Sequence, residues 1–257
     1  MTNTKRVLLL KNKTVPIDPY ESNFEQNDFE PVFIPMIQHM HLPLECLHLL
    51  QNDAYMTQLK HIVISSQRTV ECLNESVVPN LSVSQQDALL QKTVYTVGPA
   101  TASFLQRCGF KDVRGGIDAG NGSILADVII SDLKNDATTD FSSMPTLLLL
   151  VGETRRDIIP KKLASAGLKS QEVVTYKTEI LDNNLQRFVS LFNSQCWVVF
   201  FSSQGTDEII DYLKDKNAQV ASIGPTTDEF LLSRGIRSHV VSAKPEPVSL
   251  IQSLKSV

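Results

Sequence analysis

Residues 64–71 read Ile-Ser-Ser-Gln-Arg-Thr-Val-Glu, and residues 201–208 read Phe-Ser-Ser-Gln-Gly-Thr-Asp-Glu. Five of these eight positions are identical. A second pair follows in the same order, since Gly98-Pro99-Ala100-Thr101 matches Gly224-Pro225-Thr226-Thr227. Self-similarity in a fixed order indicates repeated structural units. We therefore predict two related units, with the natural binding site in the cleft between them.

Short apolar runs alternate with amphipathic stretches along the chain. This alternation predicts an α/β fold with parallel sheets flanked by helices. By itself it would place a single domain boundary near Asn135–Pro145. The expected buried strands are Val7–Leu10, Val32–Ile37, His61–Ile64, Val94–Val97, Leu147–Val151, Val173–Tyr176, Trp197–Phe201 and Val220–Ile223. The expected helices are Gln67–Leu73, Thr101–Cys108, Ser123–Leu133, Arg156–Ala166, Asn184–Phe192, Thr206–Leu213, Thr227–Ser233 and a short terminal helix from Ser249 to Leu254.

The composition excludes several classes of protein. The 257 residues are 42% hydrophobic and 20% charged, as in ordinary globular domains and unlike disordered chains. No apolar run approaches the roughly 20 residues that cross a bilayer, and the N-terminus lacks the apolar stretch of a signal peptide. A net charge of −4 argues against a nucleic-acid binder. We expect a cytoplasmic protein with no membrane or nucleic-acid partner.

Metal and cofactor motifs are not found in the sequence. Cys46, Cys72, Cys108 and Cys196 are scattered, so we interpret them as reduced thiols that behave as small buried hydrophobes. His39 and His41 lie close together, but no second ligand pair has zinc-like spacing. The glycine-rich segment 115–123 has neither a Walker A ending nor a dinucleotide fingerprint. We interpret it as a loop leading to a helix capped near Asn121 or Ser123.

Each repeated motif stands where a strand ends and a helix begins. In parallel α/β sheets ligands bind at the carboxyl ends of the strands, where helix N-termini offer free N–H groups. Hydroxyl groups at these positions favour an anion-binding site, although plain helix capping would select the same residue types. The hydroxyl residues are Ser65, Ser66, Ser202, Ser203, Thr101, Thr226 and Thr227.

The segment Gly152-Glu153-Thr154-Arg155-Arg156-Asp157 follows one of the expected strands. Its arginines suit bidentate binding of carboxylates, and a solvated first helical turn is the alternative. No Ser/His/Asp arrangement or pair of carboxylates is indicated by spacing, so nothing points to nucleophilic catalysis.

Taken together and in this order, these motifs resemble the uroporphyrinogen-III synthase family. The resemblance spans most of the chain. The matching stretches are Val7–Lys11, Ile64–Glu71, Val97–Ser103, Asn121–Val128, Leu148–Gly167, Val173–Thr178, Val199–Gly205 and Ala221–Thr227.

The resemblance implies a cofactor-free enzyme of heme biosynthesis. Its substrate would be hydroxymethylbilane, a linear tetrapyrrole polycarboxylate, and its product uroporphyrinogen III, formed with loss of water and inversion of the last ring. The resemblance also implies two α/β lobes joined by a two-segment β link. The first lobe would comprise 1–35 plus 179–257, the second 38–174, with links near 35–39 and 173–178. A monomer is expected.

The resemblance implies site residues as well. Tyr176, in the link, would donate a proton to the departing hydroxyl, and Thr101 would be the second catalytic residue. Lys177 is a poorer donor because adjacent strand residues point to opposite faces. The substrate-binding residues would be Ser65, Ser66, Arg68, Gly98, Asn121, Gly122, Gly152, Arg155, Ser202, Ser203, Gly205, Thr226 and Thr227.

Two other functions remain open at the level of sequence. One is a bilobed binding protein that captures a small polyanion without chemistry. The other is a two-domain nucleotide-sugar transferase, which would require a phosphate loop that the sequence does not contain.

Overall fold

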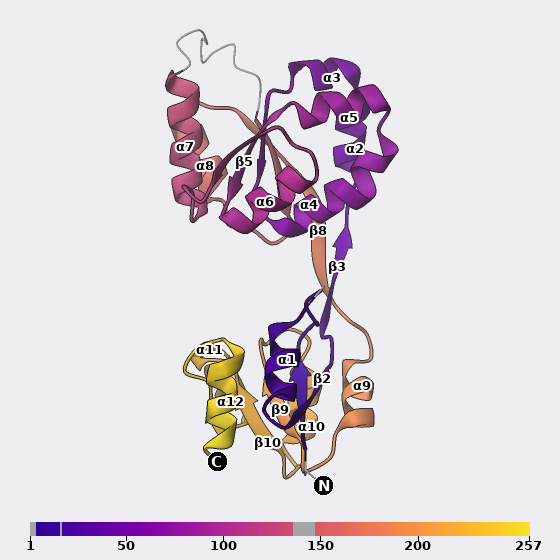
Figure 1. Cartoon of the computed structure of the whole chain (residues 1–257), viewed down its shortest axis with the longest axis vertical. Coiled ribbons are helices and arrows are strands. Elements are labelled where there is room, and N and C mark those ends of the chain that lie inside the picture. The colour runs from indigo at the N-terminus through magenta and orange to yellow at the C-terminus, as the bar shows by residue number, and fades with distance from the viewer. Residues whose placement is uncertain (1–3, 16, 136–146) are drawn as a thin grey trace. The chain divides into compact units, whose positions relative to one another are not determined.

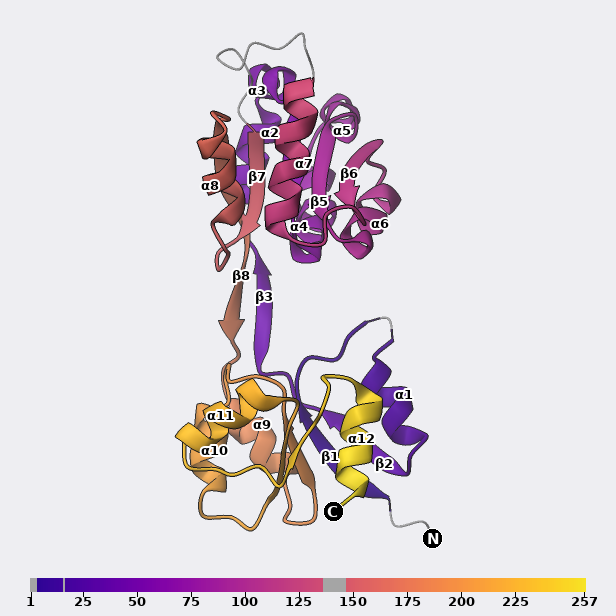
Figure 2. The same cartoon turned by 90° about the vertical axis from the view of Figure 1, so that its left-hand side faces the viewer.

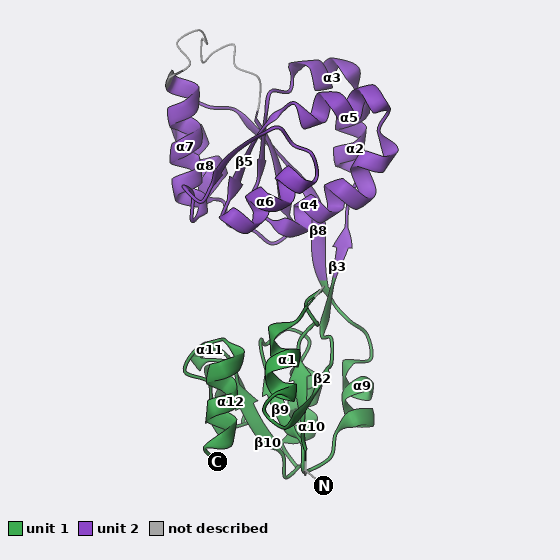
Figure 3. Cartoon of the chain, in the orientation of Figure 1, with its two compact units in different colours: residues 1–38, 179–257 green, residues 39–178 purple. Residues whose placement is uncertain are grey.

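The computed structural model describes residues 4–15, 17–135 and 147–257. The chain divides into two compact units (Figure 3). Unit 1 comprises residues 1–38 and 179–257, and unit 2 comprises residues 39–178. Asn135–Pro145, where the strand and helix pattern alone would place a boundary, lies outside the described residues apart from Asn135.

Unit 1 contains a five-stranded parallel sheet in the order β11-β10-β9-β1-β2, of which Figure 1 labels β2, β9 and β10. The strands are β1 (Lys5–Leu10), β2 (Phe29–Phe33), β9 (Trp197–Phe200), β10 (Gln219–Ser222) and β11 (Val240–Val241). The helices are α1 (Pro19–Glu25), α9 (Asn184–Leu191), α10 (Asp207–Leu213), α11 (Pro225–Ser233) and α12 (Pro247–Lys255).

Strand β1, which lies between β9 and β2 in the sheet of unit 1, is buried on both faces. Val7 and Leu9 face one apolar cluster, formed with α1 and α12, while Leu8 and Leu10 face a second, formed with α9 and α10. Because side chains alternate along a strand, a run of four apolar residues is what a doubly covered parallel strand requires. The run Val7–Leu10 therefore predicts an interior strand, and β1 is one.

Unit 2 contains a six-stranded sheet in the order β3-β8-β7-β4-β5-β6. The strands are β3 (Ile37–His41), β4 (His61–Ile64), β5 (Thr93–Val97), β6 (Asp112–Gly116), β7 (Leu147–Gly152) and β8 (Ser170–Ile180). The α-helices are α2 (Leu44–Gln51), α3 (Asp53–Gln58), α4 (Gln67–Cys72), α5 (Val83–Leu90), α6 (Pro99–Arg107), α7 (Gly122–Asn135) and α8 (Ile158–Ser165). A π-helical turn η1 (Leu73–Val77) and a 3₁₀ turn η2 (Val78–Asn80) continue α4.

Helices cover both faces of the unit 2 sheet. On one face α7 and α8 pack over Leu147 and Leu149 of β7. On the other, helices α2 to α6 pack over Leu148 and Leu150. Neither apolar cluster contains a residue of unit 1. Because β4, β5 and β7 are parallel neighbours, their carboxyl ends meet at one edge of this sheet.

Strands β3 and β8 carry the chain between the units. They are hydrogen-bonded neighbours and run in opposite directions (Figure 2). The first passes from unit 1 to unit 2 after Gln38, and the second returns after Thr178. His39 Nδ1 lies 2.9 Å from Thr178 Oγ1, which ties the two strands together by side chains as well.

Each expected helix, and all but one of the expected strands, is found with small shifts at its ends. The prediction of one strand over Val32–Ile37 is wrong. Strand β2 ends at Phe33 and β3 begins at Ile37, because Pro35 has no N–H to donate to a sheet. Ile34 and Met36 are nevertheless buried, so the prediction that this apolar run is buried holds for these two residues. Elements α1, α2, α3, α5, β6 and β11 were not predicted.

Within the described ranges, no helix has the length and apolar character needed to cross a membrane.

Candidate active site

A pocket of about 590 Å³ opens at the carboxyl ends of β4, β5 and β7, within unit 2. We call it the unit 2 pocket. Its floor is apolar and its rim is polar, the character of most small-molecule sites. The lining residues are Val63, Ser65, Ser66, Val97, Asn121, Gly122, Ser123, Leu149, Val151, Gly152, Thr154, Arg155, Arg156, Ile158, Ile159, Pro160, Glu172 and Tyr176.

Ser66 enters the pocket as the N-cap of α4. Its backbone is extended (φ −135°, ψ 135°), and its Oγ accepts a hydrogen bond from the N–H of Arg68 at 3.2 Å. The cap satisfies one of the N–H groups that a helix start leaves unpaired. The same Oγ lies 3.1 Å from the hydroxyl of Tyr176. The sequence leaves helix capping and ligand binding as alternatives for this serine. In the structure, the Oγ atom that caps the helix is also the atom that faces Tyr176.

Tyr176 stands against a glycine. A Cβ at Gly152 would lie 2.6 Å from Tyr176 Cζ and 2.7 Å from its hydroxyl oxygen, closer than such atoms approach. The Tyr176 ring thus takes the space of a side chain at position 152. The family resemblance predicts Gly152 as a substrate-binding residue, and in the structure its close neighbour is the tyrosine.

A β-bulge between β7 and β8 brings Tyr176 opposite Gly152. Val151 pairs with Val174, and the next pair is Gly152 with Tyr176, which leaves Thr175 as the extra residue. Thr175 is fully buried, donates its hydroxyl to the carbonyl of Val151 at 3.1 Å and lies 3.1 Å from Thr69 Oγ1. Bulges commonly redirect side chains beside functional sites. Here the two hydroxyl contacts hold Thr175 in place, and they thereby fix the position of the next residue, Tyr176.

His39 approaches the tyrosine from β3. The two rings meet edge to face, with centroids 6.3 Å apart. Burial, and then the nearby charge of Arg68, lower the pKa of His39 below its ordinary value. The imidazole is therefore neutral at neutral pH. Sequence reasoning considered His39 only as a metal ligand and did not place it near Tyr176.

The start of α7 forms the opposite wall. Asn121 caps this 14-residue helix, because its Oδ1 accepts the N–H of Ile124 at 3.0 Å. The cap predicted near Asn121 or Ser123 is therefore confirmed. Gly122 fits tightly, since a Cβ there would lie 3.2 Å from Ile158 and Ile159. The first N–H groups of α7 and their partial positive charge lie at the pocket rim.

The two arginines of the rim differ in what they already bind. Arg155 Nε bonds to Glu172, and its Nη1 donates to the carbonyl of Glu153 at 3.1 Å. Arg156 forms no salt bridge with any described residue and is exposed. Glu172 was missed by sequence reasoning, because nothing in its neighbourhood marks it as facing the pocket. Arg156 is therefore the cation available to a carboxylate ligand.

Three of the predicted residues of unit 2 lie outside this pocket. Arg68 is exposed and forms a salt bridge with Glu71. Gly98, at φ 76°, caps α6, a conformation in which glycine is strongly favoured. Thr101 lies in the first turn of α6 and is only 7% exposed. The structure thus gathers Ser65, Ser66, Asn121, Gly122, Gly152, Arg155 and Tyr176 in one pocket.

The predicted residues of unit 1 are placed at the corresponding sheet edge of that unit. Ser202 accepts the N–H of Gln204 at 3.3 Å, and Gly205 adopts φ 72° beside the carbonyl of Met36. Thr226 is exposed at the start of α11, and Thr227 is 9% exposed. Ser203 accepts a bond from Thr206 Oγ1 through its carbonyl. These contacts are turn and cap contacts, and Gly205 also lines a smaller pocket of about 320 Å³.

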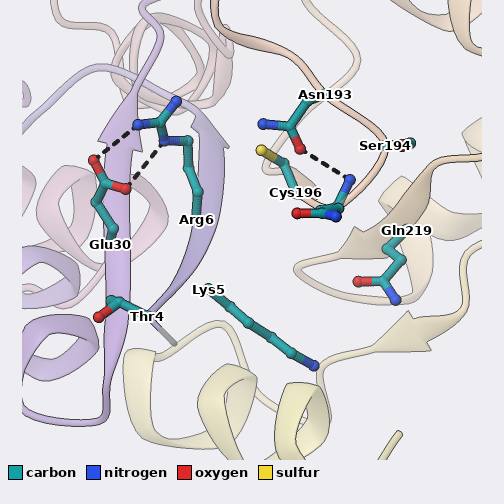
Figure 4. Close-up of a pocket in the computed structure, with 9 residues that line it drawn as sticks. Thr4, Lys5, Arg6, Glu30, Asn193, Ser194, Cys196 and Gln219 are labelled. Atoms are coloured by element: carbon teal, nitrogen blue, oxygen red, sulfur yellow. Dashed lines mark hydrogen bonds and ion pairs between the residues drawn. The ribbon is translucent and has the colours of Figure 1, made fainter. Parts of the chain in front are cut away.

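A further pocket of about 520 Å³ lies at the amino ends of β1, β9 and β10 (Figure 4). Arg6 there forms two bonds to Glu30, at 3.1 and 3.2 Å. The N–H of Gln195 is held by Asn193. This pocket contains none of the predicted site residues. It lies at the amino ends of the strands, whereas ligands of parallel sheets bind at the carboxyl ends.

The cysteines are free, and Cys46, Cys72 and Cys196 are buried as predicted, whereas Cys108 is half-buried. Burial raises the pKa of the Cys46 thiol to about 12, so this group stays protonated. In the described ranges no group of three or more His, Cys, Asp or Glu side chains is placed to hold a metal ion.

Comparison with known proteins identifies the family and the fold. The family model described as uroporphyrinogen-III synthase HemD matches residues 18–252. The chain belongs to the uroporphyrinogen-III synthase family. The family inferred from the repeated motifs is thereby confirmed.

Two curated uroporphyrinogen-III synthases match over nearly their whole lengths. The Saccharomyces cerevisiae enzyme is 52% identical, over 97% of this chain and 95% of its own. The Schizosaccharomyces pombe enzyme is 34% identical, over 97% and 96%. The match thus includes both units.

Solved structures of the same enzyme share the fold. Uroporphyrinogen-III synthetase from Helicobacter pylori superposes with a TM-score of 0.61 at 17% identity, covering 98% of this chain and 99% of that one. A mutant Thermus thermophilus synthase gives a TM-score of 0.51 at 13% identity, covering 98% of each chain. The predicted α/β class with parallel sheets flanked by helices is confirmed.

Proposed function

We propose that this chain converts hydroxymethylbilane into uroporphyrinogen III, with loss of water and inversion of the last pyrrole ring. The observation that carries the proposal is the 52% identity to the Saccharomyces cerevisiae uroporphyrinogen-III synthase over 97% of the chain. The reaction places the chain among the hydro-lyases of heme biosynthesis.

The rim of the unit 2 pocket suits the charge of this substrate. Each of its four pyrroles carries an acetate and a propionate. N–H groups at the start of α7, the hydroxyl of Ser65 and the guanidinium of Arg156 are donors that carboxylates accept from. A chain of net charge −4 binds a polyanion by such local positive potential. The apolar floor, with Val63, Leu149 and Val151, suits a pyrrole ring.

Tyr176 is our candidate for the proton donor. Its hydroxyl reaches the pocket from β8, and a phenol hydroxyl has one proton that it can donate. The Tyr176 proton is transferred to the hydroxyl of the hydroxymethyl group, the C–O bond breaks, and water leaves. The resulting azafulvene cation is attacked internally by the last pyrrole to give a spiro intermediate. The bond from that ring to its original methylene bridge then breaks and re-forms at the free α-carbon of the ring, which inverts it, and the proton lost from this carbon as the pyrrole regains aromaticity returns to Tyr176.

Unit 1 contains further residues that we propose to bind the substrate. Ser202, Ser203, Gly205, Thr226 and Thr227 would bind carboxylates in the same way, because they occupy the equivalent strand ends of the repeated motif. Thr101 stays a prediction as a second catalytic residue.

The test is direct. The pure protein is incubated with freshly generated hydroxymethylbilane, the products are oxidised, and the porphyrin isomers are resolved. Isomer III should dominate, also after exhaustive chelation. If only isomer I forms, the spontaneous product, the proposal is wrong and the chain is a binding protein for a polyanion.

The role of Tyr176 has its own test. Tyr176→Phe keeps the ring against Gly152 and removes only the donor. General-acid catalysis is worth ~10²–10⁴-fold, so kcat should fall by at least about a hundredfold while product affinity changes little. A kcat within about threefold of wild type would assign the proton to water or to a substrate carboxylate instead.

We further propose that the protein works as a monomer in the cytoplasm. Free, buried thiols such as Cys46 are typical of reducing compartments. Light scattering coupled to size-exclusion chromatography tests the monomer, since a mass near 28.6 kDa is expected.

A further inference from the structure

The hydroxyl of Tyr176 has a defined protein partner. Its oxygen lies 3.1 Å from Ser66 Oγ, and the two residues are 110 positions apart in sequence. Both are half-buried and both line the unit 2 pocket. The contact joins the interior of β8 to the N-cap of α4, so it depends on the tertiary fold and on no local motif.

The hydroxyl group of Ser66 is oriented by the helix that it caps. Its Oγ accepts the N–H of Arg68 at 3.2 Å, which occupies one lone pair and leaves the serine proton free to donate. Hydrogen bonds in such a chain polarise one another, so a bond received from the backbone strengthens the bond that Ser66 gives.

The Tyr176 oxygen is held where this proton can reach it. Gly152 leaves room for the ring, and the N–H of Glu153 donates to the Tyr176 carbonyl at 2.9 Å. Thr175, the residue before Tyr176, is buried, and its hydroxyl contacts Val151 and Thr69. Ring and backbone are thus both fixed relative to Ser66.

We propose that Ser66 is a positioning residue that donates a hydrogen bond to the Tyr176 oxygen. The inference rests on the proposed function, in which Tyr176 is the acid. When the Tyr176 O–H bond breaks and its proton leaves with the hydroxyl group as water, the phenolate accepts the Ser66 hydrogen bond. The backbone N–H of Arg68, Ser66 and Tyr176 form one donor chain, and reprotonation of the phenolate resets it.

Three substitutions at position 66 separate donation from capping. Ser66→Thr keeps both, Ser66→Asp keeps the cap because aspartate is a strong N-cap but has no proton to donate, and Ser66→Ala loses both. We expect kcat to fall about tenfold in Ser66→Ala and Ser66→Asp and to stay within about threefold of wild type in Ser66→Thr. Only Ser66→Ala should lower the melting temperature.

A double-mutant cycle shows whether Ser66 acts through the tyrosine. In a Tyr176→Phe background, Ser66→Ala should change kcat by less than about twofold, since no phenol oxygen remains to receive the bond. Gly152→Ala is an independent probe, because it keeps both hydroxyls while its methyl group displaces the Tyr176 ring. It should reproduce the loss of kcat at an unchanged yield of folded protein.

The outcomes are distinct. A wild-type kcat in Ser66→Asp, or full additivity of Ser66→Ala with Tyr176→Phe, overturns the proposal. A rise in KM at unchanged kcat assigns Ser66 to direct binding of substrate and overturns it as well. Formation of isomer III by wild type, measured in the same assays, keeps the proposed function separate from this result.

Discussion

Arg155 and Arg156 are adjacent in sequence, but their charges are used differently. Arg155 is committed to Glu172 and to backbone carbonyls, whereas Arg156 forms no salt bridge with a described residue. The segment itself does not distinguish the two arginines, because both follow the same strand and carry the same group, and the family resemblance predicts only Arg155 as a substrate-binding residue. What separates them is the position of Glu172, on a neighbouring strand and 17 residues further along the chain.

Arg156→Ala is therefore expected to weaken substrate binding more than Arg155→Ala. Loss of one charge-assisted hydrogen bond at an exposed site costs about 1 kcal/mol, so KM should rise roughly fivefold at unchanged kcat. The effect should shrink as salt is added. Arg155→Ala should mainly lower the melting temperature, because Glu172 loses its partner.

Steady-state kinetics at two ionic strengths, with thermal melts of both variants, test this assignment. A larger rise in KM for Arg155→Ala, at an unchanged melting temperature, would contradict it.

The pairing of Ser66 with Tyr176 marks the limit of sequence reasoning at the residue scale. Both residues were predicted from the family resemblance, but in different roles, one for binding and one for catalysis. Their contact depends on the bulge at Thr175 and on the absence of a side chain at Gly152. Neither feature produces a local pattern, so the contact is found only once the sheet is assembled.

Among the elements, α1 is stabilised by an ion pair that the sequence did not reveal. Asp18, fully buried, caps α1 by accepting the N–H of Tyr20 at 2.8 Å and also binds Lys11 and the N–H of Thr14. The Lys11 ammonium stands over the rings of Tyr20 and Phe33, 5.2 and 5.1 Å from their centroids. The cap Asp18-Pro19 was available as a start signal, but seven residues are too few for a periodic pattern.

This ion pair predicts a pH dependence of stability. Burial would raise the pKa of Asp18, but bonds from Lys11, Thr14 and Tyr20 outweigh it and hold the pKa below its ordinary value. A carboxyl with a lowered pKa in the folded state stabilises the fold above the unfolded pKa of about 3.9, and this contribution is lost as pH falls below it. Asp18→Asn should cost roughly 3 kcal/mol at pH 7, because it leaves Lys11 without its carboxylate.

Urea denaturation between pH 3 and pH 7 measures this contribution. The difference between wild type and Asp18→Asn should narrow towards the acid end. Asp87→Asn, at an exposed position, is the matched control and should leave stability within about 0.5 kcal/mol of wild type. A constant difference across this pH range would show that Asp18 acts by shape alone.

The elements that sequence reasoning found and missed differ in their burial. Strands such as β1, β4 and β9, covered on both faces, carry continuous apolar runs and were predicted almost to the residue. Helix α5 is half-exposed and short, although Ser82 and Gln85 form a capping box at its start. Strand β6 contains Gly115 and Gly116 at positive φ and so carries no strand propensity.

At the scale of the whole molecule, the two units have separate cores. Every residue of the two apolar clusters of unit 2 lies between Cys46 and Val173, and those of unit 1 lie outside that range. The amino-acid composition does not change at the boundary between the units after Gln38. The apolar run 32–37 resembles one continuous strand, so it gives no sign of the boundary that follows it. The family resemblance, in contrast, places links at 35–39 and 173–178, and the domain assignment stays a proposal.

Unit 2 should therefore fold on its own. A chain of residues 39–178 is expected to unfold in a single cooperative urea transition, since a continuous segment of this size with a closed core is sufficient for a domain. It should form no isomer III, because the proposed unit 1 residues are missing. Non-cooperative unfolding or molten-globule spectra would argue against an independent domain.

The pairing of β1 with β9 bears on how the chain is made on the ribosome. Val7–Leu10 leaves the exit tunnel early, but one of its two neighbouring strands, Trp197–Phe200, follows about 190 residues later. At roughly 5–20 residues per second the nascent strand waits about 10–40 s with one edge open, while the whole of unit 2 is synthesised. An uncovered apolar edge is a site of aggregation, so a molecular chaperone that shields nascent chains would find its longest opportunity here. The inserted unit is therefore synthesised completely before β1 gains its second neighbouring strand.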